Sequence, residues 1–424
     1  MAISVTQEPK DLQQANSDLL YVVSSTQTNQ PQFQYIANIQ LIYGAGAEIK
    51  TFQLKQQPNP DGYGVFNLSQ LVSSQHRTPA PNEADPKFST GENFYTFVGA
   101  SFVEEYGTSP SSSVATGSSV NAGSIYTLGG VNERNSGAWD FDAEFCYTGS
   151  SRILNQMSAC EMTTNDYGSI SWWQGSLADY GTTAVAYVDF SLRDVDNNEI
   201  TSSILYNTIE NGGGPWRDAT IGQPFASQSF NSNFSVISMA TGVQDVSTWF
   251  PAITGSDVVA NRMVGYNDLD QPIWAFRCNF TDGDCGYDTV RFAWLNENGV
   301  MDYHTFTLAE TKSDNITRET YEQTFVPYNT STSTITYDKS RRGSKVYSIS
   351  YDETRAVESD WLGQGTADHL RTLVESPEVY IQDGDDFLPV IITNSTFQYK
   401  VNPRSQKMYN LRVEYKLANN RRSR

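Results

Sequence analysis

The sequence predicts an all-β (mainly β) fold of several β-sandwich or barrel-like domains, with one short α-helix near residues 366–376. Two observations lead to this prediction. Strand formers and turn formers dominate the composition, whereas charged residues make up 18% of the chain. Apolar and polar residues also alternate with a period of two in several segments, which is typical of half-buried strands. At about 100–200 residues per domain, the 424 residues predict two or three domains.

The first predicted domain spans residues 1–108. Its strongest strand signal is QFQYIANIQLIYG (32–44). One face of that strand would carry the apolar residues Phe33, Tyr35, Ala37, Ile39 and Leu41. EIKTFQLKQQ (48–57) follows a short turn, so the two segments predict a β-hairpin. PNPDGYG (58–64) predicts a turn because Pro and Gly interrupt strands, and NFYTFVGASFVEEYG (93–107) predicts a further strand.

Three further regions follow this domain. Residues 109–125 predict a linker or loop, because a Gly/Ser/Thr-rich segment buries little apolar area. Residues 126–265 are expected to form a middle, irregular β domain. Residues 266–424 are expected to form a C-terminal β domain with one helix and a basic tail.

The C-terminal region has the clearest local signals. PIWAFRCNF (272–280) and DTVRFAWLN (288–296) predict strands around an Asp- and Gly-rich turn. Gly299 predicts the next hairpin turn, because Gly tolerates positive φ. TADHLRTLVES (366–376) predicts the helix, since Leu370, Leu373 and Val374 share one face, Thr366 can cap its start and Pro377 marks its end.

The charge is distributed unevenly along the chain. The total is −20, which argues against broad nucleic-acid binding. Residues 399–424 carry eight basic residues and one acidic residue, a net of +7, so the remainder carries −27. This tail and the basic cluster KSRRGSK (339–345) each have two possible interpretations. Each segment either docks onto an acidic neighbour or is solvated. The candidate inter-subunit contacts are Arg341, Arg342, Arg421, Arg422 and Arg424.

No catalytic, cofactor-binding or metal-binding residue is predicted. The chain lacks G-x-S-x-G, G-x-x-x-x-G-K-[ST] and H-E-x-x-H. His304 and His369 are interpreted as packing or surface histidines. DVDNNE (194–199) matches the first EF-hand spacings, but Glu199 replaces the required Gly, so a strand-end turn is expected. A non-enzymatic protein is therefore expected.

The four cysteines, Cys146, Cys160, Cys278 and Cys285, are interpreted as buried thiols. A Cys278–Cys285 bridge across the short intervening turn stays open as an alternative. The N-terminal residues contain no basic segment followed by an apolar one, so no signal peptide is predicted. No run of about 18 apolar residues exists, so no membrane-spanning helix is expected.

A group of tryptophans supports an alternative function. Trp172, Trp173 and Trp216 could form a stacking platform for a sugar ring, and any of the 48 acidic residues could supply a pair of catalytic carboxylates. The alternative function is therefore a carbohydrate-binding or carbohydrate-cleaving receptor-recognition protein of a phage tail. Aromatic residues that fill a core would give the same sequence signal.

Two stretches resemble poorly characterised virion structural proteins of tailed phages from marine and Bacteroidota hosts. They are SSTQTNQPQFQYIANIQLIY…IKTFQLKQQPNPDGYGVFNLSQLV (24–72) and RFAWLNENGVMDYHTFTL (291–308) together with residues 370–422. The resemblance implies a structural component of the neck, tail or baseplate, made in the host cytoplasm and incorporated into the virion. Its partners would be other virion proteins and copies of itself. Gly62 and Gly64 would set a turn, Gly299 a hairpin and Pro377 the end of the helix.

Overall fold

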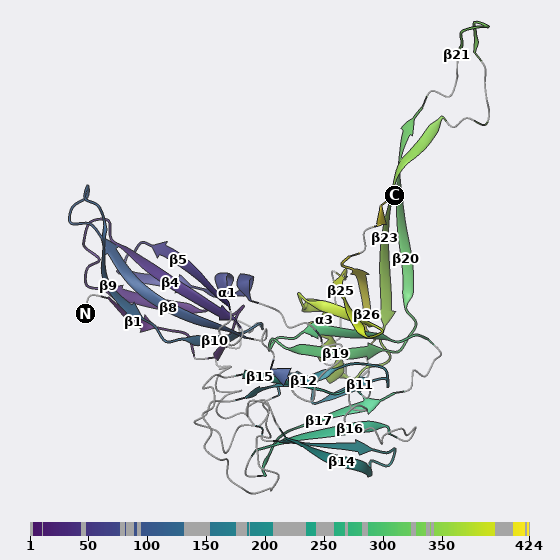
Figure 1. Ribbon diagram of the computed structural model, residues 1–424, viewed down its shortest axis with the longest axis horizontal. Coiled ribbons are helices and arrows are strands. Elements are labelled where there is room, and N and C mark those ends of the chain that lie inside the picture. Colours follow the sequence, from purple (N-terminus) through teal and green to yellow (C-terminus); the bar gives the residue numbers. More distant parts are fainter. Residues whose placement is uncertain are drawn as a thin grey trace, which may run out of the picture.

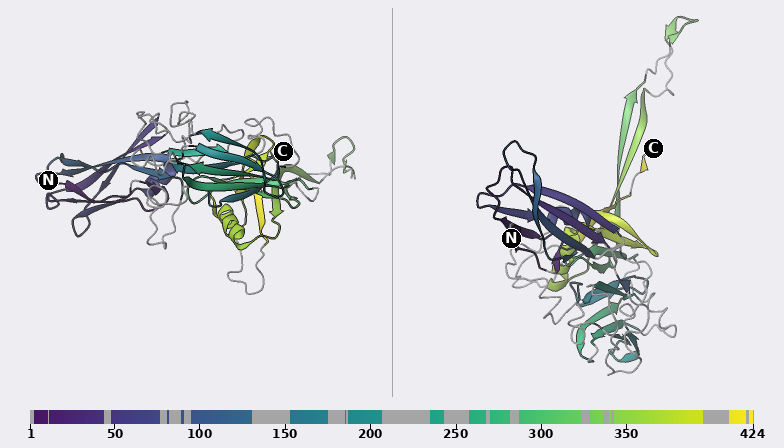
Figure 2. Two further views of the ribbon diagram at one scale, coloured as in Figure 1. Left: turned by 90° about the horizontal axis from the view of Figure 1, so that it is seen from below. Right: turned by 60° about the vertical axis from the view of Figure 1, so that its left-hand side comes forward.

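The structure, a computed structural model, is mainly β, as the sequence predicts (Figure 1). It describes residues 3–10, 12–43, 48–76, 81, 89–90, 95–130, 153–174, 185, 187–206, 235–242, 258–267, 270–281, 287–323, 328–335, 340, 343–394, 410–419 and 422–423. The strands form an N-terminal sandwich, a middle sandwich at the base of the view and a C-terminal sheet that extends into a long arm (Figures 1 and 2). Among the described residues, no helix combines the length and the hydrophobicity needed to cross a bilayer.

The N-terminal sandwich packs a three-stranded sheet on a six-stranded sheet. The first sheet contains β1 (Ile3–Gln7), β3 (Leu20–Ser25) and β6 (Tyr63–Asn67). The second contains β2 (Leu12–Gln14), β10 (Ile125–Leu128), β8 (Tyr95–Tyr106), β4 (Gln34–Tyr43), β5 (Glu48–Gln56) and β9 (Ala115–Asn121). Helix α1 (Ser69–Gln75) follows β6 and buries Val72. One continuous apolar core lies between the two sheets.

Strand β4 confirms the predicted alternation. All five apolar residues expected on one face, Phe33, Tyr35, Ala37, Ile39 and Leu41, are buried in the sandwich core. The predicted hairpin with β5 is confirmed as well, with Tyr43 opposite Glu48. The predicted turn at residues 58–64 is also present: Gly62 has a φ of +85°, and its carbonyl accepts a 2.7 Å hydrogen bond from the Tyr35 hydroxyl.

The prediction of a linker at residues 109–125 is wrong for much of that segment. Residues 115–121 form β9, which pairs with β8, and residues 125–128 form β10 inside the same sheet. Ser and Thr side chains suit an exposed edge strand, so a polar composition did not prevent pairing. The carboxylate of Glu104 anchors β9, because it accepts hydrogen bonds from the backbone N–H and the hydroxyl of Ser118.

The middle sandwich also has two sheets. The larger contains β11 (Ala159–Met162), β17 (Pro272–Phe280), β16 (Ala260–Tyr266), β13 (Tyr187–Arg193) and β14 (Glu199–Tyr206). The smaller contains β12 (Ser169–Gln174), β15 (Ser235–Ala240) and β7 (Ser89–Thr90). The predicted start of the C-terminal domain at residue 266 does not match the sheets. Strand β17, which follows residue 266, still belongs to the middle sandwich, and the C-terminal sheet begins with the next strand in sequence.

The C-terminal sheet is the largest. It contains β19 (Met301–Phe306), β18 (Val290–Leu295), β24 (Val379–Asp383), β25 (Asp386–Ile392), β26 (Arg412–Leu417), β23 (Ser344–Glu358), β20 (Thr311–Glu322) and β27 (Arg422–Ser423). Helix α3 (Gln364–Glu375) covers one face through Leu370 and Leu373, which confirms the predicted helix. A small ladder of β21 (Tyr328–Asn329) and β22 (Thr334–Ile335) lies at the far end of the arm (Figure 1).

Strand β12 joins the parts because its two faces pack in different places. Trp172 lies in the core of the middle sandwich, and the adjacent Trp173 points to the opposite side, as successive residues of a strand must. Trp173 packs there with apolar side chains from all three parts: Leu12, Leu128, Leu154, Val236 and Val300. This junction core connects the N-terminal sandwich to the remainder of the molecule.

Candidate functional site

The turn between β18 and β19 connects the three parts. Asn296 closes it, because its side-chain oxygen accepts hydrogen bonds from the backbone N–H groups of Asn298 and Val300. The side-chain amides of Asn296 and Asn298 both donate to the Leu154 carbonyl, at 3.0 and 2.8 Å. Gly299 has a φ of +85°, as its predicted hairpin role requires.

The same turn contacts the N-terminal sandwich through its backbone. The side-chain amide of Gln14 donates a 2.6 Å hydrogen bond to the Glu297 carbonyl. Gly130 lies so close that a β-carbon there would be 1.8 Å from the same carbonyl oxygen. The contact between these parts therefore requires a residue without a side chain at position 130.

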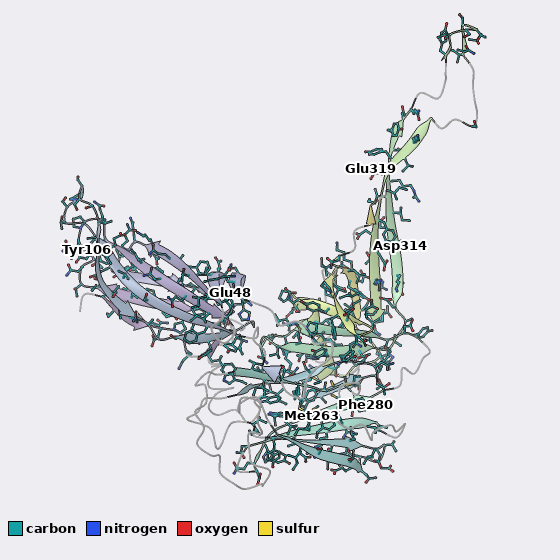
Figure 3. The ribbon with its side chains drawn as sticks, in the orientation of Figure 1. Glu48, Tyr106, Met263, Phe280, Asp314 and Glu319 are labelled. Carbon is teal, nitrogen blue, oxygen red and sulfur yellow. The ribbon has the colours of Figure 1, made fainter. Side chains whose placement is uncertain are left out.

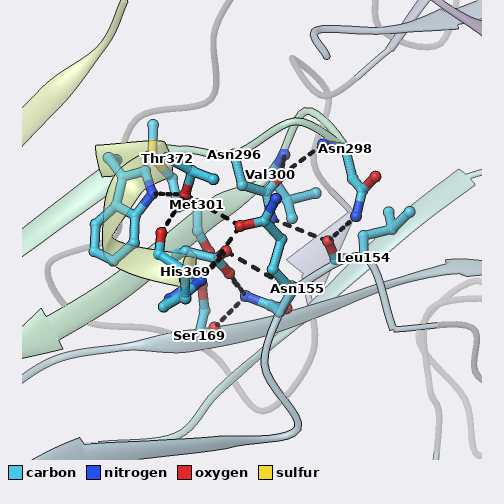
Figure 4. A network of polar contacts seen from close by, with 12 residues as sticks. Leu154, Asn155, Ser169, Asn296, Asn298, Val300, Met301, His369 and Thr372 are labelled. Atoms are coloured by element: carbon cyan, nitrogen blue, oxygen red, sulfur yellow. Dashed lines mark hydrogen bonds and ion pairs between the residues drawn. The ribbon is translucent and has the colours of Figure 1, made fainter. Parts of the chain in front are cut away.

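A polar network continues from this turn to helix α3 (Figure 4). Asn155 donates 2.9 Å hydrogen bonds to the Asp302 carboxylate and to the Met301 carbonyl. Asp302 is 2% exposed and lies 3.7 Å from the His369 imidazole, measured from Oδ2 to Nδ1. Thr372 receives a hydrogen bond from the Trp294 indole at 3.0 Å. The network joins the segment before β11 to β19 and α3.

Arg291 forms a second buried polar centre. Its guanidinium donates to the Tyr167 and Glu161 carbonyls and to the Thr305 hydroxyl, and it lies 5.2 Å from the Tyr303 ring centre. The Asp166 carboxylate accepts a hydrogen bond from Thr305 and lies 4.0 Å from Arg291. The buried cation is thus compensated by a carboxylate and by backbone carbonyls, as burial of a charge requires.

A cavity lies between these two centres, lined by Cys160, Arg291, Asp302, Tyr303 and His369 among others. Its volume is about 20 Å³, room for about one water molecule. Burial lowers the pKa of His369, against the opposing charge of Asp302. Among the described residues, no three His, Cys, Asp or Glu side chains could hold a metal ion together. The polar groups around this cavity bond across the boundaries between parts of the chain, so we call this group of contacts the clamp.

A second feature is the arm, which extends from the C-terminal sheet. It consists of β20, β23 and the sequence between them. All twelve residues of β20 are exposed, and β23 is mostly exposed outward from Tyr351. Their only described strand partners beyond the sheet are each other and β27, which pairs with Ser350 and Tyr351. Figure 3 shows Asp314 and Glu319 along the arm, away from the packed body.

Charged and phenolic groups fix the base of the arm. Arg355 lies 2.5 Å from the Glu353 carboxylate and 3.6 Å from Glu310. Glu310 also accepts a hydrogen bond from the Tyr415 hydroxyl, and burial together with that carboxylate raises the pKa of Tyr415. Together with the pairing of Arg355 and Tyr415, these contacts attach the base of the arm to β26 of the C-terminal sheet.

The glycan prediction for the tryptophans is wrong at two of its three positions. Trp172 and Trp173 are both 0% exposed, so neither offers a ring face to a sugar. Trp216 lies outside the described residues, as do Arg341, Arg342, Arg421 and Arg424. The backbone of Arg422 lies in β27, so at least this part of the basic tail pairs with the arm.

Other sequence interpretations have clearer outcomes. His304 and His369 are packed inside, and residues 194–198 form the expected strand-end turn, in which the Asp194 carboxylate accepts the Asn198 N–H. Cys278 is a buried free thiol, as predicted, and it lies directly opposite Cys160, a free thiol that is only partly buried, contrary to the prediction. Cys146 and Cys285 lie outside the described residues.

The buried polar residues of the junction were not predicted from the sequence, although a signal existed. Arg291 interrupts the otherwise apolar and aromatic strand VRFAWL, and Asp302 lies between Met301 and Tyr303 in MDYHTF. Apolar runs of this kind are typical of strands that are buried on both faces. A charged residue in such a strand requires a buried partner. Comparisons with models of known protein families and with curated proteins find no match to this chain.

Proposed function

We propose that the chain is a non-enzymatic structural component of a tailed-phage virion, in the neck, tail or baseplate. It acts through protein–protein interfaces with other virion proteins and with copies of itself. The observation that carries this proposal is the arm, a long two-stranded extension on which the large apolar side chains that the structure describes beyond Asp314 and Asp352 are largely exposed. Tyr321 and Tyr347 are 44% and 62% exposed, and their rings lie 6.2 Å apart. Such groups favour burial in an interface.

The rest of the molecule supports a scaffold role. The polar residues at the junction are used in contacts between parts of the chain, and the cavity beside them has room for about one water molecule. The resemblance of residues 24–72 and 370–422 to virion proteins suggests the kind of assembly. Trp172 and Trp173 are buried, so two of the three tryptophans on which the carbohydrate alternative rested cannot stack on a sugar.

Mass spectrometry of purified particles from a phage that carries this gene tests the proposal. We expect the chain at a constant copy number per particle. A second phage should encode a chain in which Asn-Gly replaces residues 315–352, a two-residue turn that joins the paired Asp314 and Glu353. This variant should fold but should be lost from particles. Absence of the native chain from particles would refute the proposal.

A further inference from the structure

The outer arm, residues 315–351, has two unlike faces. Cross-strand partners in an antiparallel pair point to the same side, so Ile316 shares a face with Tyr351, and Ile349 shares it with Arg318. Val346 pairs with Thr320, which lies two positions beyond Arg318 in β20, so Val346 is on this face too. Ile316, Val346 and Ile349 are 44%, 41% and 36% exposed, and we call these three residues the apolar arm face.

The opposite face is polar at the positions nearest the body, and further out it carries Tyr321, whose ring lies 6.2 Å from that of Tyr347. Its cross-strand pairs are Asn315 with Asp352 and Thr317 with Ser350. Exposed strands that have no partner commonly carry polar residues on both sides, because water contacts both. The exposed aliphatic side chains Ile316, Val346 and Ile349 all lie on one side, and this side is therefore one that a partner covers.

Charge indicates what that partner is. The outer arm contains five basic and three acidic residues, a net of +2, and residues 421–424 add three arginines beside the strand that pairs with it. Since the total is −20, the rest of the chain carries −25. Every copy of this chain thus combines a basic arm with an acidic body, which is the complementarity that a contact between two copies needs.

We propose that the apolar arm face docks onto the acidic body of a second copy of this chain. This inference rests on the proposed function for its assembly role, and it names the partner and the contact. The described strands β20 and β23 lead away from the sheet that carries them (Figures 1 and 3), so their exposed faces point away from their own body. Apolar contact holds the arm in place, and opposite charge guides it there.

Two matched double variants of the full chain test the contact. Ile316→Asp with Ile349→Asp changes the apolar arm face, and Thr317→Asp with Ser350→Asp adds the same charge to the polar face at neighbouring positions. Self-association is measured by light scattering over a concentration series at low and high salt. We expect the native dissociation constant to rise with salt, and the apolar-face variant to raise it about 100-fold by burying unpaired charges.

The polar-face variant should change the constant by less than about threefold, the range of surface effects. Ile316→Ser with Ile349→Ser should still weaken association, which separates apolar contact from added charge. A photo-crosslinking residue is placed at Val346 in a mixture of isotopically heavy and light copies, which distinguishes links between copies from links within one copy. It should link the arm to an acidic segment of the other copy. A monomeric native chain, or equal effects of the two Asp variants, overturns the inference. A monomeric chain found in particles would leave the proposed function standing, whereas a self-associating chain absent from particles would refute only that function.

Discussion

The clamp at the junction depends on one side chain, Asn155, and the stability lost on its removal can be estimated from its hydrogen bonds. Its amide nitrogen donates 2.9 Å hydrogen bonds to the Met301 carbonyl and to the Asp302 carboxylate. Its oxygen accepts a 2.7 Å hydrogen bond from the backbone N–H of Ser171. Asn155→Ala removes these three bonds in a buried site, together with a marginal 3.5 Å contact to the Ser169 carbonyl.

The expected cost follows from the three bonds. Each of the two bonds to neutral backbone groups contributes about 1 kcal/mol, and the bond to the carboxylate contributes about 2 kcal/mol. We therefore expect Asn155→Ala to lower the free energy of unfolding by about 4 kcal/mol. The loss should affect the contact between β19 and the middle sandwich first, because Asn155 and Ser171 belong to one side and Asp302 to the other.

Urea unfolding followed by tryptophan fluorescence measures this effect. All eight tryptophans lie from Trp139 onward, so the signal reports the middle and C-terminal parts. Asn198→Ala is the matched control, since its side chain makes an exposed hydrogen bond to Asp194 in a surface turn. The control should change stability by less than about 0.5 kcal/mol. A change below about 1 kcal/mol for Asn155→Ala would refute the clamp.

Two further perturbations examine the junction independently. Burial, with smaller effects from the charges of His369 and Arg291, lowers the pKa of His304 to about 3. The neutral, buried His304 therefore contributes stability that is complete above the pKa of about 6.5 in the unfolded chain and is lost as the pH falls below it. From pH 7 to pH 5 the loss should be about 2 kcal/mol in urea titrations, and His304→Gln should lack this part of the pH dependence. Gly130→Ala places a methyl group 1.8 Å from the Glu297 carbonyl oxygen, so limited proteolysis should detach the N-terminal sandwich faster. Gly365→Ala, which meets no atom within 4 Å, is the control and should leave the digestion pattern unchanged.

Local patterns in the sequence predicted the local structure well. The alternation around β4 and the periodicity of α3 each depend on one buried face, and a buried face requires apolar residues at fixed spacing. The turn at Gly299 follows from the conformational freedom of glycine. These features were predictable because each is decided within about ten residues of chain.

Features decided by distant contacts were not predictable in this way. The segments that become β17 and β18 look like neighbouring strands, yet they enter different sheets because their partners are far away in sequence. In the sequence, Trp172 and Trp173 resemble an exposed platform. In the structure both faces of β12 are covered by segments that are distant in sequence, so both rings are buried. Asn155 and Asp302 are separated by 147 residues, so the sequence did not indicate that they meet.

The junction turn also has a consequence for synthesis on the ribosome. The core of the N-terminal sandwich is formed by residues up to Ile125, so it can fold early, while translation continues. Its contact with Glu297, however, joins residues 283 positions apart. The junction core around Leu12 and Leu128 therefore stays incomplete until Val300 has left the ribosome. During that interval a nascent chain exposes an apolar surface, and slow translation between residues 130 and 297 would lengthen its exposure to aggregation.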